Sequence, residues 1–241
     1  MPIYIGTSGW TYPHWQKAFF PKNLPSVDRL HYYALRFNSV EVNTTFYGTP
    51  KKETVRAWSN AVPASFRFSI KASRFITHNK KLLEPRKSSI KLFRAIEPIA
   101  EQTTAVLFQL PPWFARDEER LRAFLRKMPS AYRYAFEFRH PTWFCEEVYD
   151  ILRDAAAALC VWDLKGKLAP IETTTDWVYV RLHGPTSRAY RGSYPDASLR
   201  GWRDHGRKWK RAKMDALFYF DNDEKGYAPI NALRLAEMLE S

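Results

Sequence analysis

Eight short apolar segments alternate with longer amphipathic segments along the 241 residues, and this alternation constrains the fold more than any other feature. Strands that alternate with helices build parallel α/β proteins, because each helix carries the chain back to the start of the next strand. Eight such repeats close a (β/α)8 barrel of the TIM type, which we therefore predict. The expected strands are Ile3–Gly6, Ser39–Asn43, Phe66–Lys71, Ala105–Gln109, Tyr134–Arg139, Leu159–Trp162, Val178–His183 and Leu217–Asn222.

A doubly wound open sheet is the alternative for this pattern. Such sheets commonly carry a glycine-rich turn, GxGxxG, after the first strand. Here Gly6–Trp10 reads GTSGW, so we favour the barrel. No linker, long repeat or low-complexity stretch divides residues 1–241, and we expect a single domain.

Helical segments are expected between the strands. Acidic residues open Asp117–Met128 and basic residues close it, as the helix dipole favours. Pro98 places the end of the helix Ser88–Ala100 close to that proline. The connection Lys165–Asp176 is expected to hold a short helix at most. The other expected helices are Val27–Phe37, Lys51–Asn60, Glu146–Ala157, Ser198–Lys213 and Tyr227–Glu240.

Polar and apolar residues alternate within four of the strands, although buried parallel strands are normally apolar throughout. In Tyr134–Arg139, the two phenylalanines face one side and Glu137 and Arg139 face the other, since successive strand residues point in opposite directions. We expect the apolar faces to pack on the helices and the polar faces to point into the barrel. The same division occurs in Ser39–Asn43, Phe66–Lys71 and Val178–His183.

Charges inside a barrel are tolerated only when they are paired and hydrogen-bonded. We therefore expect Glu41 and Glu137 to lie near Lys71, Arg139 and Arg181. Many of the polar residues come late in their strands, at the end where TIM barrels hold their active sites. This position favours a functional site over an inert ionic network. The late residues are Asn43, Lys71, Gln109, Arg139, His183 and Asp221.

The composition indicates a folded, basic protein. Hydrophobic residues make up 45% of the chain, enough for a sizeable core, and the formal net charge is +13. A charge of this sign favours nucleic acid, phosphorylated metabolites or acidic surfaces as partners, although a basic solvated surface is an equal alternative. Two cysteines and the lack of a signal-peptide pattern or a long apolar run predict a cytoplasmic protein without a membrane span.

Eight motifs along the chain resemble those of the family called domain of unknown function 72, the YecE-like barrels. The resemblance implies a TIM-barrel-like fold and implies no established reaction. Members usually have Asn-Asn where this chain has Asp221-Asn222. The motifs are GTSGW at 6–10, FNSVEVNTTFYG at 37–48, Lys71-Ala72 to Thr77-His78, LFQLPP at 107–112, EFRHPTW at 137–143, YVRLHG at 179–184, YRGSY at 190–194 and YFDNDEKGYAPINA at 219–232.

Several residues are candidates for catalysis. Glu41 and Glu137 could act as a general acid and base, as in glycosidases, or each could neutralise a nearby cation. His140 and His183 could shuttle protons. Lys71 could form a Schiff base if burial lowered its pKa, although an ion pair with Glu41 is the more ordinary role for a lysine here.

Arginine side chains and one loop are candidates for substrate binding. Arg139 and Arg181 could grip phosphate or carboxylate groups bidentately, and Tyr190 and Arg191 lie in a loop that we interpret as a lid. The other predicted binding residues are Asn43, Gln109, Asp221 and Asn222.

No metal site is predicted. His78, His140 and His183 could ligate a divalent metal with nearby carboxylates, but neither HExxH nor HxH supports this. The stretch DNDEKG at 221–226 resembles a calcium loop but has a lysine at a ligand position. The sequence specifies neither a cofactor nor an oligomeric state.

Two functions remain open from the sequence. The first is a barrel that binds or hydrolyses a small anionic substrate, phosphorylated or carboxylated. The second is a nucleic-acid-binding protein or nuclease that contacts phosphates through the basic segment 200–213. Trp202 and Trp209 share one helical face with Leu199, so we expect them in the core instead of stacking on bases.

Overall fold

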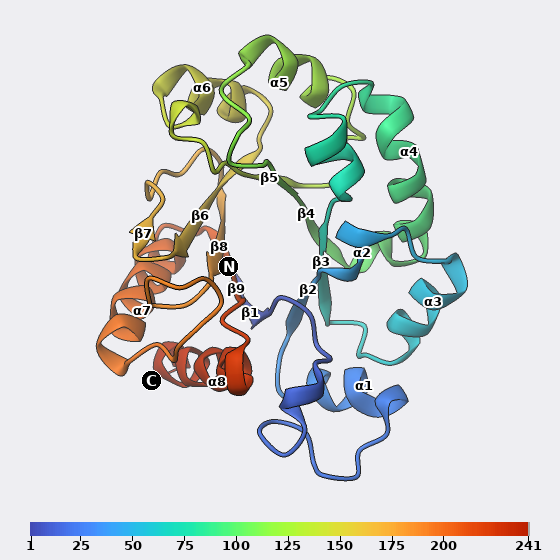
Figure 1. Cartoon of the computed structure of the whole chain (residues 1–241), viewed down its shortest axis with the longest axis vertical. Coiled ribbons are helices and arrows are strands. Elements are labelled where there is room, and N and C mark those ends of the chain that lie inside the picture. The colour runs from blue at the N-terminus through green and yellow to red at the C-terminus, as the bar shows by residue number, and fades with distance from the viewer. Residues whose placement is uncertain (241) are drawn as a thin grey trace.

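A computed structural model of the chain describes residues 1–240 and has the predicted architecture, a nearly closed ring of eight parallel strands surrounded by helices (Figure 1). The strands follow one another around the ring in the order β1-β9-β8-β6-β5-β4-β3-β2. Their bounds are β1 Ile3–Thr7, β2 Ser39–Val42, β3 Arg67–Lys71, β4 Thr103–Gln109, β5 Tyr134–Glu137, β6 Ala158–Leu164, β8 Trp177–Leu182 and β9 Asp215–Phe220.

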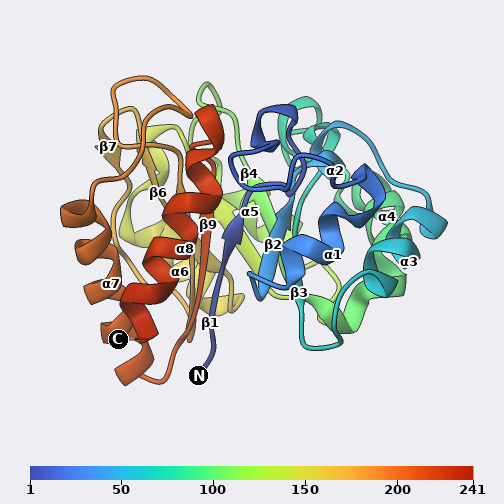
Figure 2. The same ribbon diagram turned by 90° about the horizontal axis from the view of Figure 1, so that it is seen from below.

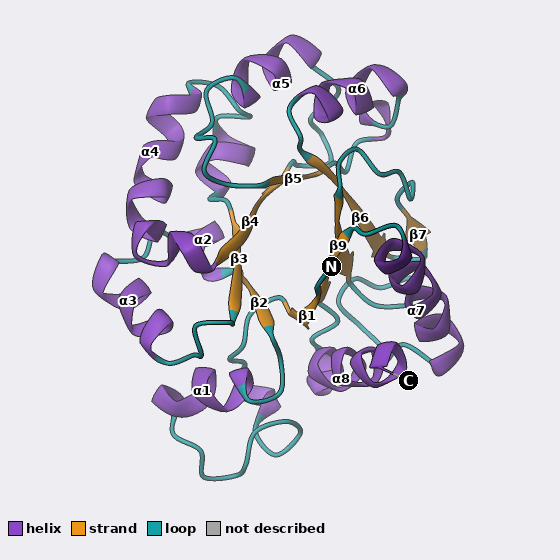
Figure 3. Ribbon diagram, turned by 180° about the vertical axis from the view of Figure 1, so that it is seen from behind, coloured by secondary structure: helices purple, strands orange, loops and turns teal. Residues whose placement is uncertain are grey.

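Helices cover the outside of this ring (Figure 3). Asp117 caps α5 by accepting a hydrogen bond from the Arg120 amide, and acidic residues fill the first turn, as the sequence indicated. Pro98 lies just beyond the end of α4, where the chain changes to a 3-10 turn. The helices are α1 Arg29–Ala34, α2 Thr44–Tyr47, α3 Lys52–Asn60, α4 Pro85–Ile96, α5 Glu118–Leu125, α6 Glu146–Asp154, α7 Asp196–Arg211 and α8 Tyr227–Glu240.

The connection Lys165–Asp176 holds no helix, which agrees with the expectation of a short helix at most, but it contains a strand that was not expected. Residues Lys167–Leu168 form the strand β7, which pairs antiparallel with the end of β6. Lys165 and Gly166 have positive φ angles of 54° and 70°, which turn the chain back on itself between the two strands. Hydrophobic periodicity alone did not reveal this two-residue turn.

Side chains close the ring between β1 and β2, where a regular ladder is missing. The carboxamide of Asn38 substitutes for a peptide group, accepting from the Ile5 amide at 2.9 Å and donating to the Ile3 carbonyl at 2.8 Å. The Tyr33 hydroxyl bridges in the same way, accepting from Thr7 N at 2.8 Å and lying 3.2 Å from Ser39 O. A Cβ on residue 6 would lie 2.0 Å from Ser39 O, so only glycine allows this approach.

The two faces of the strands form two separate apolar clusters. The larger lies between strands and helices and includes Phe68, Phe108 and Phe136. The smaller fills the lower barrel interior with Ala105, Leu107, Ala135, Ala158, Cys160, Trp177, Tyr179, Leu217 and Tyr219. Above it the interior becomes polar toward the C-terminal ends of the strands. Those ends point upward in Figure 2, as the β1 arrow shows, and toward the viewer in Figure 1.

Candidate functional site

The guanidinium of Arg181 lies at the centre of a charged cluster inside the C-terminal mouth of the barrel. Its Nε and Nη2 donate to the two oxygens of Glu41 at 2.9 and 2.7 Å, and its Nη1 donates to Glu137 at 2.7 Å. Its Nη2 also lies 3.1 Å from Asp221 Oδ2. The Arg181 side chain is 1% exposed and both glutamates are fully buried, so this is an interior ion network whose charges are paired.

A second guanidinium completes the pairing on the far side of Glu137. Arg139 Nε donates to Glu137 Oε1 at 2.5 Å, and Arg139 Nη2 also contacts that oxygen. The guanidinium carbon lies 4.6 Å from the centre of the Trp162 ring, so the indole supports it from one face. Both oxygens of Glu137 are therefore engaged by arginines, one each. We call Glu41, Glu137, Arg139, Arg181, His183 and Asp221 the ion cluster.

The tautomer of His183 follows from its neighbours. Its Nε2 lies 2.9 Å from Arg139 Nη2 and 3.3 Å from Arg181 Nη1. Guanidinium nitrogens only donate, so Nε2 accepts, and Nδ1 carries the proton that it donates to Asp221 at 2.9 Å. Both ring nitrogens are thus occupied within the cluster.

The pKa values follow from burial and charge. Burial alone would raise the pKa of Glu137, but the Arg139 and Arg181 guanidiniums outweigh it and hold that pKa well below its usual range. Burial and the same two arginines lower the pKa of His183 well below its usual value, so the imidazole is neutral at pH 7. Burial raises the pKa of Asp221 against the opposing effect of Arg181.

Hydroxyl groups that were not among the predicted site residues support the cluster from below. Ser8 Oγ donates to Glu41 Oε1 at 2.5 Å, and Tyr179 OH donates to Glu41 Oε2 at 2.7 Å. Ser69 and the Tyr179 hydroxyl lie 2.8 Å apart one layer further down. Ser8 lies within the GTSGW segment, and Tyr179 lies on the inward face of its strand two residues before Arg181. These two positions are the sequence features from which Ser8 and Tyr179 could have been predicted as site residues.

The other half of the mouth has polar groups without partners. At the ends of the adjacent strands β2, β3, β4 and β5, four side chains retain unused hydrogen-bonding capacity. Within residues 1–240, Asn43 Oδ1 and Arg139 Nη1 are buried without any hydrogen-bond partner, and Lys71 and Gln109 make no side-chain hydrogen bond. The Arg139 side chain is only 7% exposed. We call Asn43, Lys71, Gln109 and Arg139 the mouth arc.

Lys71 does not form the ion pair with Glu41 that was the more ordinary expectation. Across the described residues, no carboxylate oxygen lies within 4.0 Å of its ammonium, because Arg181 occupies both oxygens of Glu41. The ammonium lies instead 4.4 Å from the centre of the Phe46 ring, and the residue is 7% exposed. Burial, with Arg181 nearby, lowers the pKa of Lys71 to about 8.

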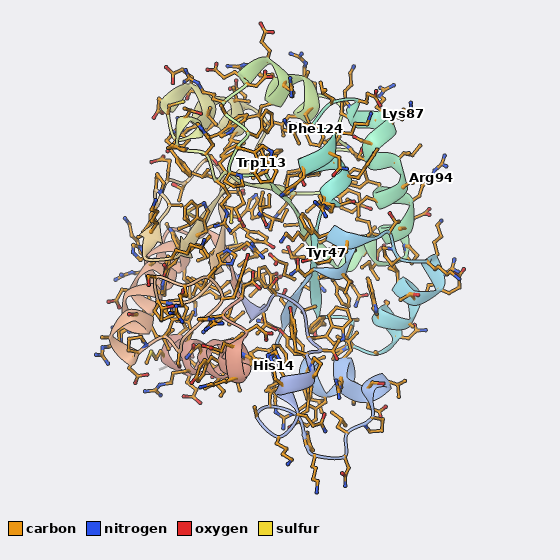
Figure 4. The ribbon with its side chains drawn as sticks, viewed as in Figure 1. His14, Tyr47, Lys87, Arg94, Trp113 and Phe124 are labelled. Atoms are coloured by element: carbon orange, nitrogen blue, oxygen red, sulfur yellow. The ribbon has the colours of Figure 1, made fainter. Side chains whose placement is uncertain are left out.

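An aromatic surface adjoins Lys71 on the rim. The His78 ring lies between Phe46, at 5.2 Å, and Trp113, at 5.9 Å between ring centres. His78 belongs to a π-helical turn, Phe75–Asn79, that follows β3. Trp113 is 64% exposed and Tyr47 is 76% exposed, and Figure 4 shows both near the opening of the barrel.

Some predicted residues lie away from the cluster. His140 is half-buried, and its Nδ1 lies 2.9 Å from the Thr142 hydroxyl within the turn that follows β5. Asn222 is buried and donates to the Gly192 carbonyl and to Asn231, both at 2.8 Å. Its contacts fix a loop and do not reach the ion cluster.

The predicted lid, residues 190–194, contacts the cluster and is anchored. Tyr190 donates its amide to the His183 carbonyl at 2.7 Å, and its ring stands edge-on to the imidazole at 5.6 Å. Glu224 accepts from the Gly192 amide at 3.2 Å and lies 3.9 Å from Arg191 Nη1. Tyr190 therefore contacts the cluster, whereas Arg191 lies on the surface.

No group of three or more His, Cys, Asp or Glu within residues 1–240 is arranged to hold a metal ion. Over the same residues, no helix is long and apolar enough to cross a bilayer. Two surface clefts lie away from the mouth. One of about 730 Å³ is formed by α5 and α6 and is lined by Leu125, Tyr132 and Ile151, and one of about 550 Å³ is lined by Met1, Leu35 and Leu239.

The basic segment 200–213 forms most of helix α7. Trp202 and Trp209 are buried in the core, as predicted. Lys208 and Lys210, on either side of Trp209 in the sequence, are exposed. The helix thus offers charge to solvent but no aromatic platform for bases.

Fold and site define a parallel (β/α)8 barrel with an ion network at the end where barrels of this class hold their active sites. A family profile described as "Protein of unknown function DUF72" matches residues 4–241. The chain belongs to this family, as its sequence motifs indicated.

Individual relatives agree with this assignment. The chain is 32% identical over 145 residues to the UPF0759 protein YecE of Escherichia coli K12, covering 60% of this chain and 51% of that protein. The matched part thus spans about half the length of the E. coli relative. It is 25% identical to the UPF0759 protein YunF of Bacillus subtilis, covering 99% of this chain and 95% of that protein.

Solved structures show the same fold. A DUF72 family protein of Thermotoga maritima superimposes with a TM-score of 0.88 at 30% identity, covering 99% of both chains. A DUF72 family protein of Enterococcus faecalis superimposes with a TM-score of 0.83 at 20% identity, covering 100% of this chain and 96% of that chain.

Proposed function

We propose that the protein binds a small organic anion, phosphorylated or carboxylated, at the C-terminal mouth of its barrel. Lys71 and Arg139 hold the negative charge, while Asn43 and Gln109 hydrogen-bond the rest of the ligand. One observation carries this proposal: Asn43 Oδ1 and Arg139 Nη1 are buried without a hydrogen-bond partner among the described residues, and Lys71 and Gln109, at the ends of the two strands between them, make no side-chain hydrogen bond. Buried polar groups are nearly always satisfied in proteins, by water or a ligand where protein groups are lacking.

The distribution of charge supports an anion over a cation. All three carboxylates of the ion cluster already face a guanidinium or an imidazole within hydrogen-bonding distance. The unused capacity is cationic: Lys71 lacks a carboxylate, and one Arg139 nitrogen lacks any acceptor. An anion bound between them offsets the desolvation of both charges, and the free Nη1 of Arg139 suits a carboxylate or phosphate oxygen.

The sequence suggested hydrolysis with Glu41 or Glu137 as acid or base, and their contacts favour another role. Arg181, Ser8 and Tyr179 saturate Glu41. A carboxylate whose pKa is held as low as that of Glu137 is a weak base. We propose that these glutamates and His183 fix the arginines in position. A hydrolytic reaction here would then rely on the amine of Lys71 as its base.

Calorimetric titration with inorganic phosphate, pyruvate and glycerol 3-phosphate tests the proposal. We expect at least one of these anions to bind the wild-type protein and to bind at least about tenfold more weakly to Lys71→Met and to Arg139→Gln, since one charge-assisted hydrogen bond contributes about 1.5–3 kcal/mol. Arg139→Gln also disturbs the ion cluster, so Lys71→Met is the cleaner variant. Lys208→Ala, on the exposed face of α7, is the matched control and should bind as the wild type does.

Two results would count against the mouth as the binding site. One is no binding of any of the three anions. The other is weaker binding when Arg207, Lys208 and Arg211 are neutralised together, with Lys71→Met unaffected, which would instead favour phosphate contact through α7, as the nucleic-acid hypothesis requires.

A further inference from the structure

We propose that Lys71 forms an imine with the carbonyl carbon of a small anionic aldehyde or ketone, whose carboxylate or phosphate is held by Arg139. This inference rests on the proposed function, because it assumes that the mouth arc binds an anion. It goes further in naming the substrate class and the atom that reacts, Lys71 Nζ.

The surroundings of Lys71 are those of a reactive amine and differ from those of a structural lysine. Structural buried lysines are paired with a carboxylate, but no carboxylate oxygen of residues 1–240 lies within 4.0 Å of this one. The acidic groups that act on it, Glu41, Asp221 and Glu137, each face Arg181. Phe46 covers one side of the ammonium with the face of its ring at 4.4 Å and offers no hydrogen-bond acceptor.

These surroundings make the nucleophilic form available at neutral pH. Burial and the nearby guanidinium of Arg181 lower the pKa of Lys71 to about 8. At pH 7.5, about a quarter of such amines are neutral, compared with about 0.1% of an ordinary lysine, an advantage of about 200-fold. Only the neutral amine attacks a carbonyl carbon.

The spacing of Lys71 and Arg139 sets the size of the ligand. Lys71 is the last residue of β3 and Arg139 follows β5, and these strands flank β4, so the two backbones are two strand spacings or about 10 Å apart. Both side chains point inward from the same rim, and their long stems shorten the gap between the charged ends. A carbonyl compound of about three to five carbons with one anionic end spans it, by the roughly 1.5 Å length of each bond.

The step balances without any further reactant. The ammonium of Lys71 releases one proton, and the neutral amine adds to the carbonyl carbon to give a carbinolamine. That intermediate takes up one proton and loses its hydroxyl group as water, leaving a protonated imine. The net change is ammonium plus carbonyl compound to iminium plus water, with no net proton and no change in oxidation state.

Borohydride trapping tests the step directly. The full-length protein is incubated at pH 7.5 with pyruvate, 2-oxobutanoate or dihydroxyacetone phosphate, reduced with sodium borohydride, digested and mapped by mass spectrometry. We expect the mass of the reduced adduct on the peptide containing Lys71 with at least one probe. Acetone, which lacks an anionic group, should label this peptide at least about tenfold less.

Lys71→Arg is the control for labelling, because a guanidinium forms no imine, so the adduct on this peptide should disappear. Anion binding by the wild-type protein, measured separately in the calorimeter, separates this inference from the proposed function. Phosphate binding with no adduct on Lys71 from any of the three probes overturns the imine and leaves anion binding intact. Labelling spread evenly over the exposed lysines, Lys208 included, also overturns it. If the wild-type protein binds none of inorganic phosphate, pyruvate and glycerol 3-phosphate, the proposed function is overturned.

Discussion

Replacing Lys71 by methionine should make the protein more stable near neutral pH, because the buried ammonium costs free energy. The folded protein lowers the pKa of Lys71 from 10.5 to about 8. At about 1.4 kcal/mol per pKa unit, keeping this group charged in the folded state costs about 3 kcal/mol below pH 8. Methionine has a similar length and no charge, so Lys71→Met should raise the free energy of unfolding by about that amount at pH 7.

The sign of the pH dependence makes the prediction specific. Between pH 8 and 10.5 the unfolded chain binds more protons at Lys71 than the folded protein, so wild-type stability should rise with pH relative to the variant. The advantage of Lys71→Met should fall from about 3 kcal/mol at pH 7 to about 1.5 kcal/mol at pH 9.5. Titratable groups common to both proteins cancel in this difference.

Urea unfolding of both proteins at several pH values measures this difference. A gap that stays constant from pH 6 to pH 9.5 would show that the pKa of Lys71 is not lowered in the folded protein. A loss of stability in Lys71→Met at pH 7 would show that the ammonium has a stabilising partner. Either result would refute the reasoning from burial.

Three further predictions concern the framework of the site. Glu41→Gln should lower the free energy of unfolding, measured by urea denaturation, by about 3–5 kcal/mol, because it leaves the buried Arg181 without its bidentate partner. Ser8→Ala should lower it by only about 1–2 kcal/mol, and equal losses in the two variants would contradict the argument. Asn38→Ala should lower the free energy of unfolding by about 1–3 kcal/mol and speed hydrogen exchange of the Ile5 amide. Asn60→Ala, exposed at the end of α3, should change the free energy of unfolding by no more than about 0.5 kcal/mol. An unchanged exchange rate would show that the closure between β1 and β2 does not need the Asn38 carboxamide. The folded pKa of Glu137 is lowered, so its contribution to stability is present above about pH 4.5 and is lost as pH falls; Glu137→Gln should flatten the acid limb of the stability curve, and an unchanged limb would contradict the pairing with Arg139 and Arg181.

The fold and the composition of the cluster could be predicted from the sequence because both depend on local periodicity. A period of two in Ser39–Asn43 and Val178–His183 determined which residues face inward, and parallel strands bring their ends to one rim. The structure accordingly brings Glu41, Glu137 and Arg181 together. The family resemblance led to the same architecture independently.

Pairing within the cluster could not be predicted, because it depends on which side chains compete for one acceptor. Lys71 and Arg181 both lie near Glu41, but the planar guanidinium matches both carboxylate oxygens and displaces the lysine. The lack of a carboxylate partner for Lys71 follows from that competition. The sequence did not predict the tight turn before β7, because it depends on the backbone conformation of two residues. It did not predict the Asn38 contacts between β1 and β2 either, because they depend on a single side chain.

The central claim is that a small anion binds between Lys71 and Arg139 at the barrel mouth. A crystal structure at high resolution, from crystals soaked in pyruvate or phosphate at pH 7, tests it most directly. We predict electron density for the anion within about 3.2 Å of both Lys71 Nζ and Arg139 Nη1. Water alone at these two nitrogens, with anions ordered only along the basic face of α7, would contradict the claim.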